Sequence, residues 1–284
     1  MEYKATMILE GGANRGVFTA GVLHNLMEHD LYCTNLIGVS AGSCNAVDYA
    51  SHQKLRSRDC FIITDKKNRW IHKNRLFSNK SLMDMDKLFD DFPKKTFKYD
   101  YDALYKYGIG CDVVTTNCLT GKTKYFDFQQ SNYSMDACRA SCSMPFVAPM
   151  VFIDGIPYMD GSVSNSVPID RAFEIGNDKI IIILTRQRSY RKSPNSNVIS
   201  HFIKKKYRKY PKFVEAQLRR PEEYNKRLDE IEELEKKGRV FVIRPEVTPV
   251  GRMETDVEKL TFFYKHGYNL MERELPKLKE YLEK

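Results

Sequence analysis

Residues 38–42 read GVSAG and directly follow the apolar run NLI at 35–37. This is the sequence form of a nucleophile elbow, a sharp strand-to-helix turn that presents a serine at the top of a sheet. Such a turn needs glycine on both sides of the serine, because a Cβ there would collide with the neighbouring chain, and Gly38 and Gly42 meet this need. A serine before a helix can also be an ordinary N-cap. The motif alone therefore leaves a catalytic and a structural interpretation of Ser40 open.

A second glycine cluster lies one predicted strand earlier. Residues 10–16 read EGGANRG, after the apolar segment 5–9 and before a helical pattern. Because the carboxyl ends of parallel strands meet at one edge of a sheet, we expect this loop beside the elbow. A loop of small residues that leads into a helix presents backbone N–H groups, which can stabilise an oxyanion. Arg15 in this loop can contact an anionic head group or pair with a carboxylate, and the sequence does not choose between the two.

Nucleotide binding by the glycine cluster is disfavoured. A Walker loop needs Lys and then Ser or Thr after its last glycine, but Val17 and Phe18 follow Gly16. A dinucleotide fingerprint needs glycine where Ala13 stands and an acidic residue at the end of the next strand. That strand ends in the elbow instead.

The serine needs a base to take its proton. Neither His201, in a basic stretch, nor His266, in a helical run, has a setting that would fix a catalytic imidazole. Asp154 is simplest as the turn residue of a hairpin. Asp160 ends the second strand of that hairpin and is followed by Gly161, so its carboxylate can point toward the sheet edge where Ser40 lies. A second turn or a helix cap is the structural alternative for Asp160.

Together these residues resemble the patatin-like phospholipase family, such as its bacterial acyl hydrolases. The glycine-rich motif is similar to 11–16, the Gly-x-Ser-x-Gly elbow to 38–42, and the Asp-Gly pair to 160–161. Secondary matches are Arg139-Ala140-Ser141 running into Pro145 and Pro149, and Asn165 followed by Pro168. The resemblance covers roughly residues 5–185, with the motifs in the family order.

The resemblance implies a Ser–Asp dyad, with Ser40 as the nucleophile, Asp160 as the proton acceptor and Gly161 as the turn after the acid. It also implies hydrolysis of lipid acyl esters with no metal and no cofactor. Two residues depart from the family pattern, Ala13 and Ser162; both side chains are small and preserve the backbone geometry, so we expect activity to survive. The implied oxyanion hole is formed by the backbone of Gly11, Gly12, Ala13, Asn14, Arg15 and Gly16.

Alternation of strand and helix signals predicts an α/β fold with three layers, a mainly parallel central sheet flanked by helices. Strands are expected near 5–9, 35–39, 108–116, 122–127, 151–159, 179–184 and 239–244. We expect a catalytic core over 1–185 and a basic, mainly helical part over 186–284 that packs on the core and adds the last strand.

Two helical segments are expected in the last third, a charged helix over 225–237 that Gly238 stops and one or two amphipathic helices over 256–282. The stretch 51–93, rich in charge and aromatics such as Trp70 and Phe77, is expected to cover the sheet edge beside the site.

The composition fits one large α/β core, with 284 residues of which 42% are hydrophobic. The N-terminus has none of the sections of a signal peptide, and no apolar run approaches the ~18 residues that span a bilayer. Seven cysteines without Cys-x-x-Cys spacing favour reduced thiols over disulfides or a zinc site. We therefore expect a cytoplasmic protein.

The net charge of +9 is concentrated in residues 186–220, which hold twelve Lys or Arg against one acid, Glu215. Interleaved aromatic residues make the segment suited to an anionic membrane surface. A solvated loop and helix face is the commonest explanation of such a run, the membrane surface comes second, and nucleic acid is the least expected partner. Peripheral association with the inner face of the membrane is the corresponding expectation for location.

Two classes of function follow. The first is a serine hydrolase of lipid esters, with phospholipids, lysophospholipids or simpler acyl esters as substrates. The second is a non-catalytic or weakly active lipid-binding or regulatory protein of the same fold. The intact serine, acid and glycine loop favour the first. Head group, chain length, bond position and oligomeric state lie beyond the sequence.

Overall fold

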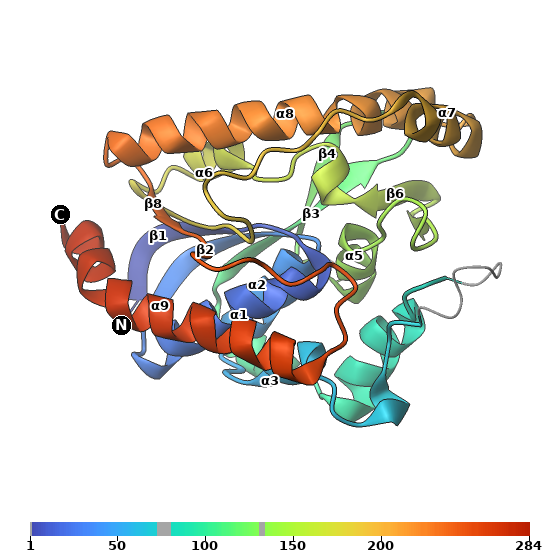
Figure 1. Cartoon of the computed structure of the whole chain (residues 1–284). Coiled ribbons are helices and arrows are strands. Elements are labelled where there is room, and N and C mark those ends of the chain that lie inside the picture. Colours follow the sequence, from blue (N-terminus) through green and yellow to red (C-terminus); the bar gives the residue numbers. More distant parts are fainter. Residues whose placement is uncertain (1, 73–80, 131–133) are drawn as a thin grey trace.

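A mixed eight-stranded sheet forms the middle layer of the protein, and helices cover both of its faces (Figure 1). The computed structural model describes residues 2–72, 81–130 and 134–284. The strands are β1 (Glu2–Leu9), β2 (Tyr32–Val39), β3 (Gly110–Asn117), β4 (Thr123–Asp127), β5 (Val151–Ile153), β6 (Ile156–Asp160), β7 (Lys179–Ile183) and β8 (Phe241–Ile243). The α-helices are α1 (Gly16–Glu28), α2 (Ala41–Ala50), α3 (Arg56–Phe61), α4 (Tyr101–Tyr107), α5 (Ser134–Ser141), α6 (Ile169–Ile175), α7 (Asn197–Lys206), α8 (Pro211–Lys236) and α9 (Val257–Glu283). Other helical segments are η1 (Ala13–Arg15), η2 (Lys66–Asn68), the π-helical η4 (Lys87–Thr96) and η5 (Gly161–Val163).

The predicted α/β fold is confirmed, and the sheet is mixed. Its order is β5-β6-β3-β2-β1-β7-β8, with β4 paired to β3 outside this path. The run β3-β2-β1-β7-β8 is parallel. Strands β4 and β6 are antiparallel to β3, and β5 is antiparallel to β6. Every predicted strand is present, and the segment predicted at 151–159 is split by the turn at Asp154.

The register of the sheet brings the ends of three strands together. At the end of β1, Leu9 pairs with Gly38 of the elbow. On the other side of β2, Thr115 of β3 pairs with Asp160, the last residue of β6. The glycine loop after β1, the elbow after β2 and the acid of β6 therefore lie at one edge of the sheet.

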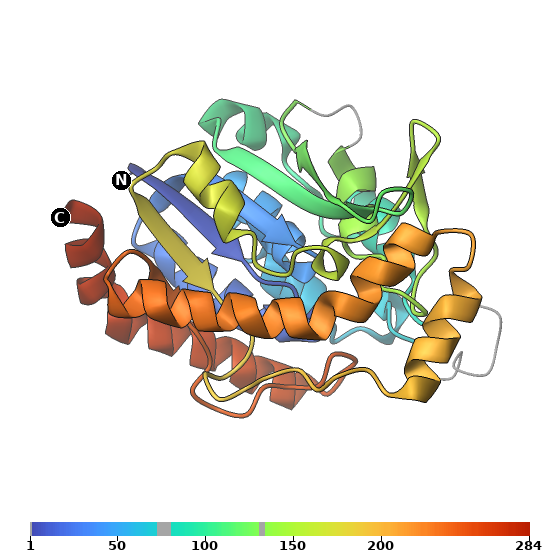
Figure 2. The same ribbon diagram turned by 90° about the horizontal axis from the view of Figure 1, so that it is seen from above.

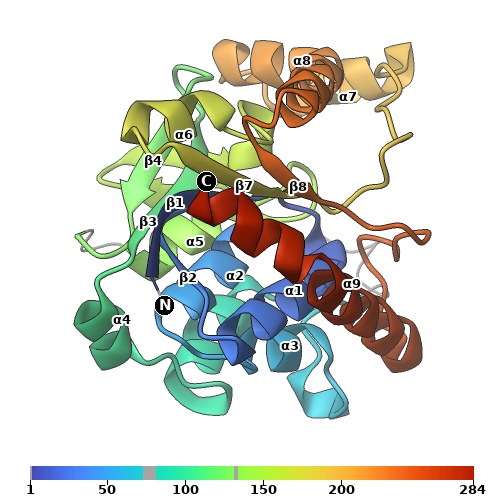
Figure 3. The ribbon, with the colours of Figure 1, turned by 90° about the vertical axis from the view of Figure 1, so that its left-hand side faces the viewer.

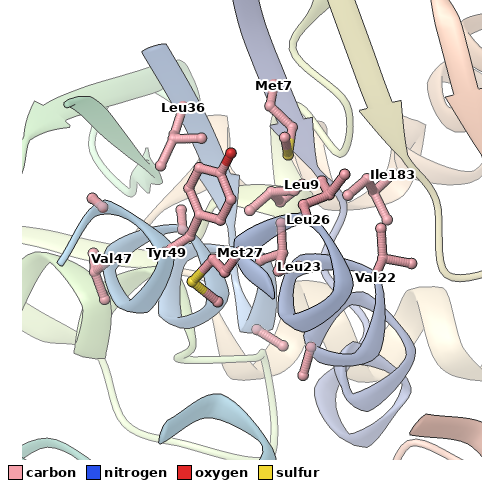
Figure 4. Packing of buried hydrophobic residues seen from close by; sticks show 14 of the residues in the cluster. Met7, Leu9, Val22, Leu23, Leu26, Met27, Leu36, Val47, Tyr49 and Ile183 are labelled. Atoms are coloured by element: carbon pink, nitrogen blue, oxygen red, sulfur yellow. The ribbon is translucent and has the colours of Figure 1, made fainter. Parts of the chain in front are cut away.

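The central strands are buried on both faces, which explains their continuous apolar runs. On β1, Met7 and Leu9 belong to a cluster with α1, α2 and α9, while Ile8 belongs to a cluster with α6 and α8. Figure 4 shows the first cluster, in which Leu23 and Leu26 of α1 approach the sheet. Figure 3 shows the two helical layers on opposite sides of the strands.

The last hundred residues contribute to all three layers. Strand β8 extends the parallel sheet beside β7, α9 packs along α1, and the long α8 lies across the other face (Figure 2). The prediction that the charged helix begins near residue 225 is wrong, because α8 starts at Pro211 and continues through Pro221. Proline suits the first turn of a helix, where its missing N–H costs nothing, and Pro221 alone does not end a helix whose apolar side is buried. In the described ranges, no helix combines the length and hydropathy needed to cross a membrane.

Candidate active site

Ser40 occupies a strained backbone conformation between β2 and α2. Its φ of 55° and ψ of −127° lie in a region that non-glycine residues rarely adopt and that clusters at functional sites. An added Cβ at Gly38 would collide with Ser43, and one at Gly42 would collide with the carbonyl oxygen of Leu9. The two glycines therefore let the turn pass between its neighbours, as the elbow motif requires.

The structure brings Ser40 and Asp160 into direct contact. The Oγ of Ser40 donates a hydrogen bond of 2.9 Å to Oδ2 of Asp160. The other carboxylate oxygen accepts from the backbone N–H of Ser162 at 2.8 Å. Both side chains are buried, with 5% of Ser40 and 1% of Asp160 exposed. One oxygen of the acid is thus held in place, and the other faces the hydroxyl.

A second serine fixes the backbone of the elbow. The hydroxyl of Ser141, at the end of α5, accepts the N–H of Ser40 at 2.8 Å and donates to the carbonyl of Val114 at 2.6 Å. The acid is anchored similarly, because its own N–H donates to the carbonyl of Ser143 at 3.0 Å and its carbonyl accepts from Thr116 at 2.8 Å. Ser141 was part of a secondary sequence match, but nothing in that match indicates this contact.

The structure reduces the number of backbone N–H groups in 11–16 that are free to donate to an oxyanion. The N–H of Asn14 donates to the carbonyl of Arg252 at 3.2 Å, that of Arg15 to Gly12 at 3.2 Å, and that of Gly16 to Ala13 and Asn14. Among the described residues, the N–H groups of Gly11, Gly12 and Ala13 have no protein acceptor. These three amides remain as candidate donors to an oxyanion.

The glycine loop passes directly against the serine at Gly11. A Cβ added to Gly11 would come within 2.7 Å of the Cβ of Ser40, so only glycine allows this approach. Ala13, one of the departures from the family pattern, has a positive φ of 49°. The loop therefore keeps a glycine-like backbone at Ala13 despite the methyl group.

Ser40 lies at the junction of two cavities with opposite chemistry. The first is apolar, encloses about 750 Å³ including its open mouth, and has Ser40 in its wall. Its other walls include Phe61, Trp70, Met83, Leu88, Phe89 and Phe92. The second is polar, spans about 410 Å³ including its open mouth, and is lined by both Ser40 and Asp160. Ala13, Ser40 and Met144 line both cavities.

The stretch 51–93, which we expect to cover the sheet edge beside the site, contributes many of the residues that line the apolar cavity. Trp70 forms part of the wall of this cavity, whereas Phe77 lies outside the described residues.

A buried acid, Asp48, also lines the apolar cavity. Asp48 accepts 2.6 Å hydrogen bonds from Arg56 and Ser57. Burial raises the pKa of Asp48, and the Arg56 guanidinium opposes this shift.

A histidine, or a cluster of metal-binding side chains, would be a further candidate for chemistry near the serine. In the described part of the chain, no histidine lines either cavity and no three His, Cys, Asp or Glu side chains cluster as metal ligands would. His266 instead accepts the N–H of Glu246 at 3.1 Å, far along the sequence from the site. All seven cysteines are free thiols.

A strained serine at a strand–helix turn, a buried carboxylate in contact with it and a loop of free amides define an α/β protein with a serine–aspartate site. A model of the patatin-like phospholipase family matches residues 7–173, more than half of the chain. The chain belongs to the patatin-like phospholipase family, whose members act on lipid substrates. The resemblance inferred from the sequence is thus confirmed. Residues 210–283 match a separate domain of unknown function, DUF6363.

The individual proteins similar to this chain include a bacterial relative and a solved structure. The uncharacterized protein YjjU of Escherichia coli K12 is 27% identical over an alignment of 190 residues that covers 64% of this chain and 52% of that protein. The alignment thus spans about half the length of this relative. The crystal structure of VipD from Legionella pneumophila aligns with a TM-score of 0.48 and 14% identity, covering 98% of this chain and 67% of that one.

Proposed function

We propose that this protein is a serine acyl hydrolase that cleaves lipid esters with Ser40 as the nucleophile and Asp160 as the base. The observation that carries the proposal is the 2.9 Å hydrogen bond from the Ser40 hydroxyl to the Asp160 carboxylate. Nucleophile and base must lie within such reach for proton transfer. Membership of a family that acts on lipids supports an acyl ester as the substrate.

The chemistry proceeds in two stages. In the first, Ser40 Oγ attacks the ester carbonyl while its proton passes to Asp160, and the oxyanion accepts hydrogen bonds from the free amides of 11–13. The alcohol leaves with the proton from Asp160, so that an acyl-enzyme remains. In the second, water gives a proton to Asp160 and attacks the acyl carbonyl. The bond from this carbon to Ser40 Oγ then breaks, Asp160 returns the proton to Oγ, and the fatty acid is released. Each oxyanion donor in comparable sites is worth about 3 kcal/mol of barrier.

The apolar cavity is suited to the acyl chain of the substrate. Its walls are mostly hydrocarbon and aromatic, and Ser40 is one of the residues that line it. Burial of a methylene there stabilises the complex by about 0.8 kcal/mol. A chain in this cavity would place its carbonyl carbon beside the serine.

Covalent labelling tests the proposed nucleophile. A fluorophosphonate probe should label the wild-type protein at Ser40, and Ser40→Ala should remove the label. Ser189→Ala, which changes an exposed serine, is the matched control and should be labelled like the wild type. A folded wild-type protein that takes up no probe and cleaves no ester would instead favour the non-catalytic lipid-binding alternative.

We also propose that α7 contacts an anionic membrane surface. Its exposed apolar side chains are Val198, Ile199 and Phe202, exposed by 64%, 50% and 56%. The last turn carries Lys204–Lys206, and each lysine near an anionic surface adds about 1 kcal/mol. Exposed apolar groups beside basic ones are the features of an interfacial helix.

Vesicle binding tests this surface. The protein should sediment with anionic but not with neutral vesicles, and the bound fraction should fall as salt rises. Phe202→Ser should weaken binding about tenfold, because a phenylalanine loses its burial in the interface. Phe262→Ser is the control, since the exposed fraction of Phe262, 62%, is similar to that of Phe202. Phe262 lies on α9, which is across the sheet from α7 (Figure 1). Equal binding of both variants, or no binding at low salt, would remove α7 from this role.

A further inference from the structure

The polar cavity behind the serine is surrounded by an excess of positive charge. Its lining includes Ser40 and two acids, Asp160 and Glu10. Five cationic side chains line it. They are Arg15, Arg186, Lys192, Arg220 and Arg252. We call these five residues the cation cluster.

No member of the cation cluster forms an ion pair with a carboxylate in the described ranges, although most other arginines do. The Nε atoms of Arg15, Arg186 and Arg220 are buried and lack any hydrogen-bond partner. Arg15 is the most enclosed of the five, with only 5% of its surface exposed. Buried polar groups are nearly always paired, so three such atoms around one cavity call for an explanation.

The two acids of the cavity are already engaged. Glu10 accepts from the N–H and hydroxyl of Thr185 at 2.6 and 3.0 Å and from the hydroxyl of Tyr224 at 2.7 Å. Asp160 is held by Ser40 and Ser162. Neither carboxylate therefore neutralises the cluster by direct contact.

Mutual repulsion and burial act on the cations together. Burial, and then the neighbouring Arg186, lowers the pKa of Arg15 to about 10. Burial, followed by Arg220, holds the pKa of Lys192 well below its usual range. Lys192 lies 3.4 Å from the centre of the Tyr224 ring and Arg186 lies 4.2 Å from that of Tyr190, contacts that compensate only part of the charge. An anion in the cavity would supply what the protein lacks.

We propose that the cation cluster binds a phosphate group. Guanidinium groups are suited to phosphate because they offer paired donors in a planar fork, and four of the five members of the cluster carry one. The proposal rests on the proposed hydrolase function in one respect, which is that the phosphate can belong to the substrate. A glycerophospholipid carries its phosphate a few bonds from its ester carbonyls. With the phosphate in the cluster and the acyl chain in the apolar cavity, an ester would lie between them at Ser40.

The origin of the cluster gives the C-terminal part of the chain a role. Four of its members come from beyond residue 173, where the family match ends, and Arg220 and Arg252 lie within the domain of unknown function. Arg220 also donates a 2.6 Å hydrogen bond to the hydroxyl of Ser162, next to the catalytic acid. We infer that this domain supplies the recognition of phosphate to a site whose chemistry is built by the N-terminal part.

Direct binding of inorganic phosphate tests the cluster without any need for catalysis. Calorimetric titration of the wild type should show one site, and phosphate should raise Tm. Arg220→Gln and Arg252→Gln should each weaken binding at least about tenfold through loss of a charge-assisted contact. Arg219→Gln is the matched control, because it removes the same charge from the same turn of α8 but pairs with Glu215 outside the cavity. If Arg220→Gln fails to fold, the exposed Arg252 still provides the test.

A second arm separates a lipid head group from free phosphate as the source. The ratio of kcat/KM for a phospholipid to that for a diacylglycerol with the same chains is compared among these variants. A ratio that falls in Arg220→Gln and Arg252→Gln assigns the phosphate to the substrate, and an unchanged ratio with lost phosphate binding assigns it to a free phosphate ligand. No phosphate binding by the folded wild type, or equal binding by all variants, overturns the proposal. Because the first arm needs no turnover, the failure of the hydrolase proposal is recognised separately, by the absence of probe labelling.

Discussion

Asp160→Asn should reduce kcat by about 10³-fold or more while the protein remains folded. General-base catalysis by a positioned side chain contributes about 10²–10⁴-fold, and Asp160 is the one acid in hydrogen-bond contact with Ser40 among the described residues. The amide is nearly the same size as the carboxylate, and its oxygen can still accept the N–H of Ser162. The loss should therefore fall on the chemical step, and KM should change little. The measurement is steady-state hydrolysis of a soluble ester, with thermal unfolding as the check on folding.

Asp154→Asn is the matched control for this experiment. Asp154 lies six residues earlier, exposed at the hairpin turn between β5 and β6, where asparagine tolerates the positive φ as well as aspartate does. This variant should keep the activity of the wild type. Ester cleavage by Asp160→Asn within a few-fold of the wild-type rate would show that another group takes the proton from Ser40.

The elbow, the glycine loop and the position of the acid could be predicted because each is a local backbone problem. A serine at φ 55° needs small neighbours, and a loop passing against it needs Gly11. Each of these two steric requirements is met by glycine at a fixed position in a short motif, which can be recognised in the sequence. The parallel order of β1 and β2 then places two such loops side by side. The contact between Ser40 and Asp160 required one further element, the antiparallel pairing of β6 with β3, which the hairpin pattern alone does not specify.

Apart from Arg15, whose place on the glycine loop allowed contact with an anionic head group, the members of the cation cluster could not be predicted, because nothing local distinguishes them. Arg186, Lys192 and Arg220 belong to the same basic run as the exposed Lys204–Lys206. The direction in which each side chain points decides its role. Arg186, Lys192 and Arg220 line the cavity beside Ser40, whereas the lysines of α7 face solvent. The direction of each side chain depends on how α8 and the segment after β7 pack on the sheet. This packing is set by apolar contacts between residues that are distant in the sequence. A composition count therefore identified the charge but not its use.

The packing of α9 on α1 depends on two glycines that no motif marks. A Cβ at Gly21 of α1 would collide with the carbonyl of Tyr264, and one at Gly267 of α9 would collide with the carbonyl of Phe18. The collisions are reciprocal, so the two helices touch backbone to backbone at this crossing. Each glycine reads in the sequence as a weak point of a helix, and only the partner helix explains why it is there.

Gly267→Ala should therefore destabilise the protein even though alanine is the better helix former. Alanine gains about 1 kcal/mol in helix propensity, but an added methyl in a packed contact costs about 1–3 kcal/mol, and more where backbone must move. Here the obstacle is the carbonyl of Phe18, which belongs to α1 and cannot rotate away. We expect a net loss of about 2 kcal/mol in the free energy of unfolding, measured from the midpoint of urea denaturation.

Gly251→Ala is the control for this loss, because a Cβ at Gly251 would meet no atom within 4 Å. Its stability should equal or slightly exceed that of the wild type, since alanine restricts the unfolded chain. A Gly267→Ala variant as stable as Gly251→Ala would show that α1 and α9 are not in backbone contact. If the contact exists, the cost follows from geometry, because two helices that meet carbonyl to Cα leave no room for even one carbon atom between them. The close approach also keeps Phe18 against Phe263, whose ring centres lie 5.4 Å apart. Separation of the helices at Gly267 would thus weaken the core on one whole face of the sheet.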